Sequence, residues 1–321
     1  YESVRSKISS IQLSAKPINE DVRSPWLTVP AAVSHHVDKF LGPSPYKGRK
    51  GIEPCGAKGV YLVEVLERRN DLLKISNLIK RSRLQEAKDL GIHVGFVDAE
   101  HVYPMVGGRN IEKWGINSYI YMLVPHSSKG EALYRGIPTE TLQAKYYRTY
   151  DWLYYFHDLL RDTRIRSAKF FDVNQFPWYR LDNVGDYTFK PYKVLWQEQA
   201  KSLDCCVVST IRDEFVFDKI VVTDSKVLFV PFDSEDEAHY LCGVLNSKIV
   251  EQIIQGYTID TNRGTDIVKN IRIPRFDPTN PVHMEISKLS LSCHKAYKDN
   301  DRKLLSLLNK SLNEIVPVIF P

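Results

Sequence analysis

Short apolar runs bounded by turn residues recur through the first part of the chain. Tyr119–Val124 is an unbroken apolar run that ends before Pro125, and it is too short for a typical helix. Val60–Leu66 and Leu72–Ile79 are also rich in apolar residues, with charged positions between them. Runs of this length and composition are typical of strands. We therefore predict a β-rich half over about 45–126.

A second group of short apolar runs lies further along the chain and predicts another β-rich half over about 185–275. Asp224 and Ser225 form a polar pair between two of these runs, a pattern typical of a tight turn. The strands are expected to follow one another as a meander formed by Lys193–Trp196, Cys205–Thr210, Lys219–Val222 and Lys226–Pro231.

Helical periodicity appears between and after these halves. Thr139–Arg161 contains no Gly or Pro, and its apolar residues are spaced at near-helical intervals, so we predict one long helix that joins the halves. Ser234–Gln255 predicts another helix with Ser234 as its N-cap. Pro281–Lys298 and Arg302–Val316 predict a closing pair of amphipathic helices.

Together these elements predict an α+β fold with mixed or antiparallel sheet segments and long helices. We expect one α/β region over 1–275 and a helical segment over 276–321. Val4–Leu13 alternates loosely and predicts an edge strand. No apolar run approaches the roughly 20 residues that a membrane-spanning helix needs.

The positive charge of the chain is unevenly distributed. The formal net charge is +5, yet Pro45–Arg83 alone contains ten Lys or Arg residues against four acids. A local basic excess of this kind is the expected electrostatic footprint of nucleic-acid binding. A solvated basic face is the structural alternative.

Two glycine-containing loops carry cations that can bind a phosphate backbone, one in Gly42–Gly59 and one in His101–His126. In the stretch His101–His126, Gly107 and Gly108 allow a close backbone approach, and Arg109 follows them. Strands Val60–Leu66 and Tyr119–Val124 are expected to share a sheet, so the loops that precede them should lie on one face. The candidate DNA contacts on this face are Lys47, Arg49, Lys50, Lys58, Arg109, Lys113 and Trp114.

An opposite wall is expected from the later part of the chain, through Lys190, Lys193 and Arg263. Arg109 is the best candidate for base reading, because a guanidinium can bridge guanine O6 and N7. Two structural alternatives stand beside this hypothesis. Arg109 could instead pair with Glu112 or another nearby acid, and Trp114 could simply cover the core.

The common motifs of catalysis and metal binding are absent from the sequence. HExxH, GxSxG, GxGxxG and the P-loop pattern do not occur. Glu86-Ala87-Lys88 matches the ExK half of a nuclease site but lacks an upstream Pro-Asp pair. Five cysteines without a CxxC pair favour a reducing cytoplasm and argue against a zinc site. We therefore expect a cytoplasmic binding protein with no catalytic residue and no metal ligand.

The order of several segments resembles the target-recognition region of TaqI-like DNA adenine-N6 methyltransferases, including Type IIG restriction-modification enzymes. The resemblance covers roughly Ser24–Ile319. It implies sequence-specific recognition of double-stranded DNA. The segments that carry it are Pro25-Trp26, VYPMVGGRNIEKW, YMLVPH, FPWYRL, PYKVLW, LCGVLNSKIV, IRIPRF and the closing helices.

The chain departs from that family in its catalytic motifs. It contains neither the Asn/Asp-Pro-Pro-Tyr/Phe motif nor the glycine motif that binds AdoMet in the family. The resemblance therefore implies that the methyltransferase domain, with AdoMet and with or without a nuclease domain, lies elsewhere in the same polypeptide. The alternatives are a nuclease or transferase with an unrecognised active site, and a module that binds RNA or an acidic protein.

Overall fold

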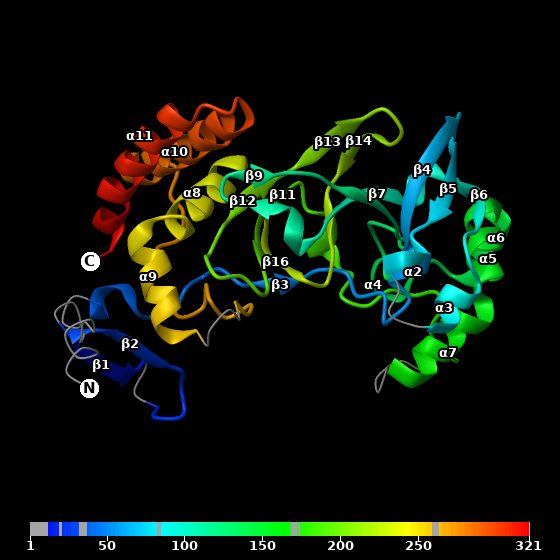
Figure 1. Cartoon of the computed structure of the whole chain (residues 1–321), viewed down its shortest axis with the longest axis horizontal. Helices are drawn as coiled ribbons and strands as arrows, with labels where there is room; N and C mark the ends of the chain where they lie inside the picture. Colours follow the sequence, from blue (N-terminus) through cyan, green and yellow to red (C-terminus); the bar gives the residue numbers. More distant parts are fainter. Residues whose placement is uncertain are drawn as a thin grey trace, which may run out of the picture. The chain divides into compact units, whose positions relative to one another are not determined.

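The computed structural model describes residues 12–18, 21–31, 37–81, 85–167, 172, 174–258 and 263–320 (Figure 1). The chain divides into two compact units, each built from segments that are distant in sequence. Unit 1 comprises Tyr1–Gly48, Glu198–Cys205 and Asp236–Pro321, and unit 2 comprises Arg49–Gln197 and Cys206–Glu235. This division differs from the expected boundary at 275/276, because the chain passes between the units several times.

Unit 2 contains a six-stranded mixed sheet in the order β15-β7-β10-β4-β5-β6. All neighbouring strands are antiparallel except β15 and β7, which are parallel. The strands are β4 (Leu62–Arg69), β5 (Leu72–Asn77), β6 (Val94–Asp98), β7 (Val102–Val106), β10 (Ile120–Leu123) and β15 (Val222–Thr223).

A four-stranded antiparallel sheet, in the order β12-β11-β16-β3, completes the main β-structure of unit 2. Two hairpins accompany it, β8–β9 and β13–β14. The bounds of these strands are β3 (Arg49–Lys50), β8 (Ile111–Glu112), β9 (Gly115–Ile116), β11 (Tyr192–Gln197), β12 (Cys206–Val208), β13 (Thr210–Asp213), β14 (Phe217–Ile220) and β16 (Val227–Phe232).

The two β-rich halves are not independent, and the predicted meander is wrong. β15 comes from the later half but pairs with β7, whereas β3 comes from the earlier half but pairs with β16. The reason is that backbone pairing extends across the halves, which the spacing of short runs along the sequence does not reveal. The predicted α+β class with mixed and antiparallel sheets is confirmed.

The predicted strand at Val60–Leu66 begins later than expected. Residues Lys58–Tyr61 form a helical turn, α2, and β4 follows it. In a strand, Val60 and Tyr61 would point to opposite faces. The turn instead buries both side chains and allows the Tyr61 hydroxyl to donate to the Tyr179 carbonyl at 2.8 Å.

The predicted long helix over Thr139–Arg161 is divided into three: α5 (Thr139–Lys145), α6 (Tyr147–Tyr155) and α7 (His157–Ser167). Tyr146 and Phe156 leave helical geometry at the two breaks. Tyr146 packs edge-on against His101 and donates to Glu100 at 3.0 Å. Aromatic contacts outside the helix therefore outweigh helical periodicity here.

Helix α6 covers the edge of the six-stranded sheet at β6. The backbone N–H and the hydroxyl of Thr149 donate to Asp98 at 2.9 and 2.7 Å, and Trp152 packs beside Gly95. Buried Leu73, Val97, Trp152 and other apolar side chains form the main core of unit 2. Two shorter helices in this unit are α3 (Gln85–Asp89) and α4 (Glu131–Arg135).

Unit 1 combines a β-hairpin with helices. β1 (Leu13–Pro17) pairs with β2 (Trp26–Pro30), while residues 4–11 of the predicted Val4–Leu13 edge strand lie outside the described residues. The closing pair is confirmed as α10 (Pro281–Lys298) and α11 (Arg302–Ile315). Asn280 caps α10 by accepting from Val282 N, with Pro281 at the first helical position.

The predicted helix Ser234–Gln255 is interrupted, giving α8 (Glu235–Leu245) and α9 (Lys248–Tyr257). At the break, the Asn246 amide accepts from Cys205 N at 3.0 Å and donates to Cys205 O at 2.8 Å. The Asn246 side chain therefore satisfies both backbone hydrogen-bonding groups of Cys205 instead of lying on the surface of a continuous helix.

Short 3-10 turns connect many of these elements. They are η2 (Asp38–Phe40), η3 (Ile79–Arg81), η4 (Ala99–His101), η5 (Gly108–Asn110), η6 (Asp186–Phe189) and η7 (Val316–Ile319). No helix within the described residues is long and apolar enough to cross a membrane.

Candidate nucleic-acid interface

The glycine-rich segment Gly42–Gly59 precedes α2, and its part in unit 2 meets the loop after β7 at a single turn, Asp224–Lys226. Asp224 N donates to Val106 O at 3.1 Å, which places this turn beside the end of β7. Gly51 N donates to Val227 O at 3.0 Å, and Ile52 N donates to Thr223 O at 2.8 Å. The turn thus joins both candidate loops through backbone hydrogen bonds.

The expected topological reason for this meeting is wrong. β4 and β10 do share a sheet, but they are antiparallel, with Met122 opposite Leu62. The start of β4 therefore lies near the end of β10, so the loops that precede the two strands approach opposite ends of the pair. The meeting depends instead on β15, which pairs in parallel with β7.

Arg109 lies in a short turn whose backbone is held rigidly. The side chain of Asn110 accepts from Gly107 N at 3.1 Å and donates to Ser118 Oγ at 2.6 Å. Gly108 is buried because its backbone packs against Lys226 O and the side chain of Gln197, each about 3.1 Å from the position of a Cβ atom. A rigid backbone of this kind can present the Arg109 side chain in a defined direction.

The Arg109 side chain itself is exposed and makes no ion pair or hydrogen bond with any residue that the structure describes. The predicted alternative, a pair with Glu112, is not formed. Glu112 instead accepts from Asn117 Nδ2 at 3.0 Å. Arg109 is therefore available to a ligand.

Three further cations lie on the segments that meet at the turn. Arg49 and Lys50 form β3, where Arg49 is opposite Phe229 and its guanidinium lies 5.0 Å from the centre of the Tyr187 ring. Lys226 is exposed and sits in the turn itself. We call Arg49, Lys50, Arg109 and Lys226 the cationic rim.

Lys58 has a structural role at this place. Its ammonium lies 2.5 Å from Asp224 Oδ1 and 2.7 Å from Oδ2, and both side chains are largely buried. The ion pair ties helix α2 to the Asp224–Lys226 turn and neutralises the Lys58 charge. Lys58 therefore supports the position of the rim instead of offering a free cation.

Lys113 and Trp114 form the two-residue turn of the β8–β9 hairpin. Lys113 is half-buried, whereas the Trp114 side chain is only 1% exposed. Trp114 also has a φ of 77°, an unusual value for a bulky residue. An indole in this state cannot stack on a base, so the structural alternative describes Trp114 better than the predicted DNA contact.

The three residues expected to form an opposite wall do not form an exposed cationic surface. Lys190 pairs with Asp233 at 2.7 Å. Lys193 is buried, donates to Lys190 O at 2.7 Å, and has its pKa lowered to about 7 by desolvation. Arg263 belongs to unit 1, where it is buried and hydrogen-bonded to Thr258 Oγ1 and Lys201 O.

Lys47 belongs to unit 1, whereas the residues of the rim belong to unit 2. It is exposed and lines a cavity together with Lys269. Lys226, Lys269 and Tyr187 were not among the residues predicted from the sequence. Lys226 had a usable signal, because it directly follows the predicted Asp224-Ser225 turn. No sequence pattern distinguishes the other two from ordinary surface residues.

No group of three or more His, Cys, Asp or Glu side chains within the described residues is arranged to hold a metal ion. All five cysteines are buried and unbonded to one another.

No protein-family model matches this chain, and no curated protein matches it in sequence. Among solved structures, the Type IIL restriction-modification enzyme MmeI in complex with DNA is similar over 97% of this chain and 39% of MmeI, with a TM-score of 0.52 and 12% identity. The Type IIG restriction endonuclease BpuSI is similar over 90% of this chain and 32% of BpuSI, with a TM-score of 0.41 and 12% identity. The similarity to MmeI shows that this chain shares the fold of part of that enzyme, and the chain spans less than half the length of either neighbour.

Proposed function

We propose that this chain recognises a specific sequence in double-stranded DNA as the target-recognition part of a restriction-modification enzyme. The observation that carries the proposal is the Arg109 side chain, which is exposed and makes no ion pair or hydrogen bond with any described residue, on a loop held by hydrogen bonds among the cations of the rim. The fold similarity to MmeI, a structure that includes DNA, supports it.

The residues of the rim divide between two tasks. Arg49, Lys50 and Lys226 bind phosphate groups, which supplies affinity without sequence information. Arg109 reads a base edge in the major groove, where guanine presents two acceptors that match the guanidinium. Lys58 and Asp224 hold the turn that brings these segments together.

Substitution of Arg109 tests this division of tasks. Arg109→Ala is expected to weaken binding to the preferred duplex by about 1–3 kcal/mol and to relax specificity at one base pair. The preferred sequence is found by selecting random duplexes with the chain. Binding is then measured by fluorescence anisotropy on the preferred duplex and on single-substituted duplexes across a salt series.

Arg212→Ala is the matched control, because Arg212 is an exposed arginine of the same unit on a different strand. It is expected to leave both affinity and specificity unchanged. A loss in Arg109→Ala that is equal for all duplexes, or no loss, would remove Arg109 from the base-reading role. Failure of the unmodified chain to prefer any duplex would contradict the proposed function itself.

We further propose that the modification chemistry of the enzyme is adenine-N6 methylation, carried by an AdoMet-binding domain of the same polypeptide. The resemblance of the segment order to TaqI-like methyltransferases supports this assignment. The absence of the glycine motif and of the Pro-Pro motif from these 321 residues indicates that AdoMet binds elsewhere.

Calorimetry with AdoMet tests this last point. The chain is expected to show no binding heat at AdoMet concentrations up to 1 mM, on the order of the weakest affinities that support cofactor use. An AdoMet-dependent methyltransferase that carries both motifs serves as the positive control. Stoichiometric binding to this chain would overturn the assignment, and metal-dependent cleavage of DNA by the chain would favour the nuclease alternative.

A further inference from the structure

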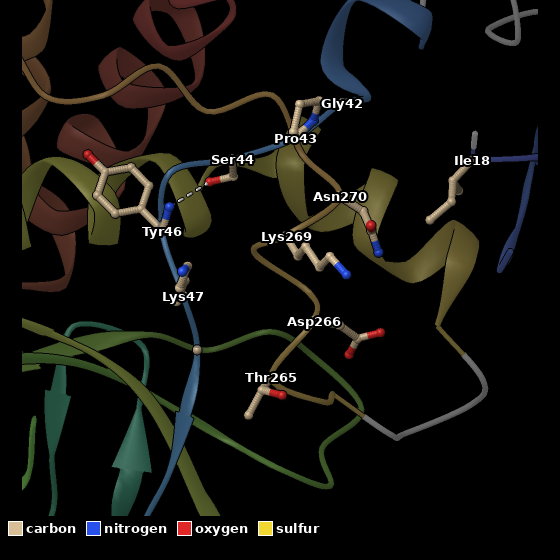
Figure 2. Close-up of a pocket in the computed structure, with 11 residues that line it drawn as sticks. Ile18, Gly42, Pro43, Ser44, Tyr46, Lys47, Thr265, Asp266, Lys269 and Asn270 are labelled. Atoms are coloured by element: carbon tan, nitrogen blue, oxygen red, sulfur yellow. Dashed lines mark hydrogen bonds between the residues drawn. The ribbon is translucent and has the colours of Figure 1, made fainter. Parts of the chain in front are cut away.

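Two segments of unit 1 form a cavity with backbone-paired walls (Figure 2). Gly42 N donates to Asn270 O at 3.1 Å, and Ser44 N donates to Lys269 O at 3.2 Å. The bridge between Leu41 and Ile271 continues the same antiparallel pairing. Residues 41–44 and 269–271 are thus held together by their backbones.

Close contact at the other end of the cavity also fixes the walls. A Cβ atom on Gly48 would lie 2.4 Å from Thr265 O, so only glycine fits between these backbones. Lys47 therefore lies directly before the close contact between Gly48 and the backbone of Thr265. This geometry positions Lys47 beside the segment that carries Lys269.

The cavity has a volume of about 640 Å³ and a positive lining. Lys47 and Lys269 are exposed, and neither ammonium has an ion pair or hydrogen bond to a residue within the described parts of the chain. Asp266 is the acid among the lining residues. Figure 2 shows Lys269, Asn270 and Asp266 on one segment facing Ile18, while the ring of Tyr46 points away.

The charges of this lining select an anion. Two lysines and one aspartate line the cavity, which leaves an excess positive charge, and lysine binds phosphate as a point charge. The amide of Asn270 and the hydroxyls of Ser44 and Thr265 add neutral hydrogen-bonding groups. The same groups also suit a free nucleotide phosphate, so the test has to distinguish a nucleotide from a DNA backbone.

The position of Lys47 in the sequence favours a DNA phosphate over a free nucleotide as the ligand of this cavity. Lys47 precedes Arg49 of the cationic rim by two residues, and an extended chain spans at most about 3.6 Å per residue. We propose that Lys47 and Lys269 form a second, sequence-independent site that binds phosphodiester groups of the duplex whose bases Arg109 reads. The proposal rests on the proposed function.

The double variant Lys47→Ala/Lys269→Ala tests the site in the full chain. The slope of the logarithm of affinity against the logarithm of salt concentration should fall in magnitude by about 1.8, because each lost phosphate contact removes about 0.9. At 0.15 M salt this corresponds to a loss of about 30-fold in affinity, equal for preferred and unrelated duplexes. Melting temperatures confirm that the variant is folded.

Lys303→Ala/Lys310→Ala is the matched control, because both lysines are exposed on α11 of the same unit. It should retain the original slope. Amine labelling followed by mass spectrometry provides a second readout. Duplex DNA should protect Lys269 from labelling, whereas 1 mM AMP should not.

The outcomes separate this inference from the proposed function. If the unmodified chain prefers a duplex but the double variant behaves like the control, the second site is wrong and the function stands. If AMP protects Lys269 and DNA does not, the site binds a nucleotide and the inference is overturned. If the unmodified chain prefers no duplex, the proposed function is wrong, and the second site, which rests on it, is wrong with it.

Discussion

Gly51→Ala is expected to destabilise unit 2 by at least about 3 kcal/mol, equivalent to a fall in melting temperature of roughly 6–12 °C. A Cβ atom on Gly51 would lie 2.2 Å from Asp224 O and 2.6 Å from Thr223 O. Both neighbours are backbone atoms, so neither can move aside by changing rotamer. The segment would have to separate from the turn that it supports.

The same substitution should weaken binding to every duplex, because separation would displace β3 and break the Lys58–Asp224 ion pair. Thermal unfolding followed by circular dichroism measures the first effect, and anisotropy measures the second. Gly95→Ala is the matched control. Its Cβ atom would meet a side chain, Trp152, at 3.3 Å and can be accommodated by a small shift. Equal effects of the two substitutions would show that the Gly51 contact is not required.

Lys193→Met is expected to stabilise unit 2, an unusual result for a substitution in the interior of a sheet. Lys193 is 1% exposed on β11, and its ammonium donates to one carbonyl, that of Lys190, with no carboxylate near enough to pair with it within the described chain. Desolvation lowers its pKa from 10.5 to about 7. Methionine has a similar length and carries no charge to desolvate.

The pH dependence gives the sign of this effect. Between about pH 7 and pH 10.5 the unfolded chain binds a proton at Lys193 and the folded chain does not, so stability rises with pH. At pH 7 the penalty is about 4 kcal/mol, and loss of the hydrogen bond to Lys190 O offsets about 1 kcal/mol of the gain. The free energy of unfolding of Lys193→Met should therefore exceed that of the unmodified chain by about 3 kcal/mol at pH 7. The rise in stability between pH 7 and pH 10.5 that Lys193 causes should be absent from this variant.

Chemical unfolding at several pH values tests this expectation. Lys190→Met is the control, since Lys190 is partly exposed and its ion pair with Asp233 is of the surface type that contributes about 0–1 kcal/mol. A loss of stability in Lys193→Met, or an unchanged pH dependence, would show that the ammonium is better solvated or paired than its surroundings indicate.

Local patterns determined much of the secondary structure. Pro281–Lys298 was predicted from its amphipathic pattern to be a helix, with the bounds that α10 has, and the Asn280 cap that begins this helix also acts within a few residues. The apolar runs at Tyr119–Val124 and Lys226–Pro231 likewise became β10 and β16 with small changes at their ends. Where capping and burial are local, the sequence is sufficient.

Longer elements were less predictable, because contacts distant in sequence interrupt them. Asn246 ends α8 by hydrogen bonding to the backbone of Cys205, and Tyr146 ends α5 while contacting Glu100 and His101. Helical periodicity alone continues through both positions. The partner that ends each helix lies more than 40 residues away, beyond the range of any local pattern.

For the candidate site, the sequence identified the loops and several cations but could not decide their environments. The basic composition and the paired glycines by themselves indicated Arg109, Arg49 and Lys50. Tertiary structure alone decided that β15 pairs with β7, which brings Asp224 against Lys58 and leaves Arg109 without an acidic partner in the described chain. It also buried Trp114 and Lys193. The physical reason is that residue type sets the charge of a side chain, whereas its burial and partners depend on which distant strands pair beside it.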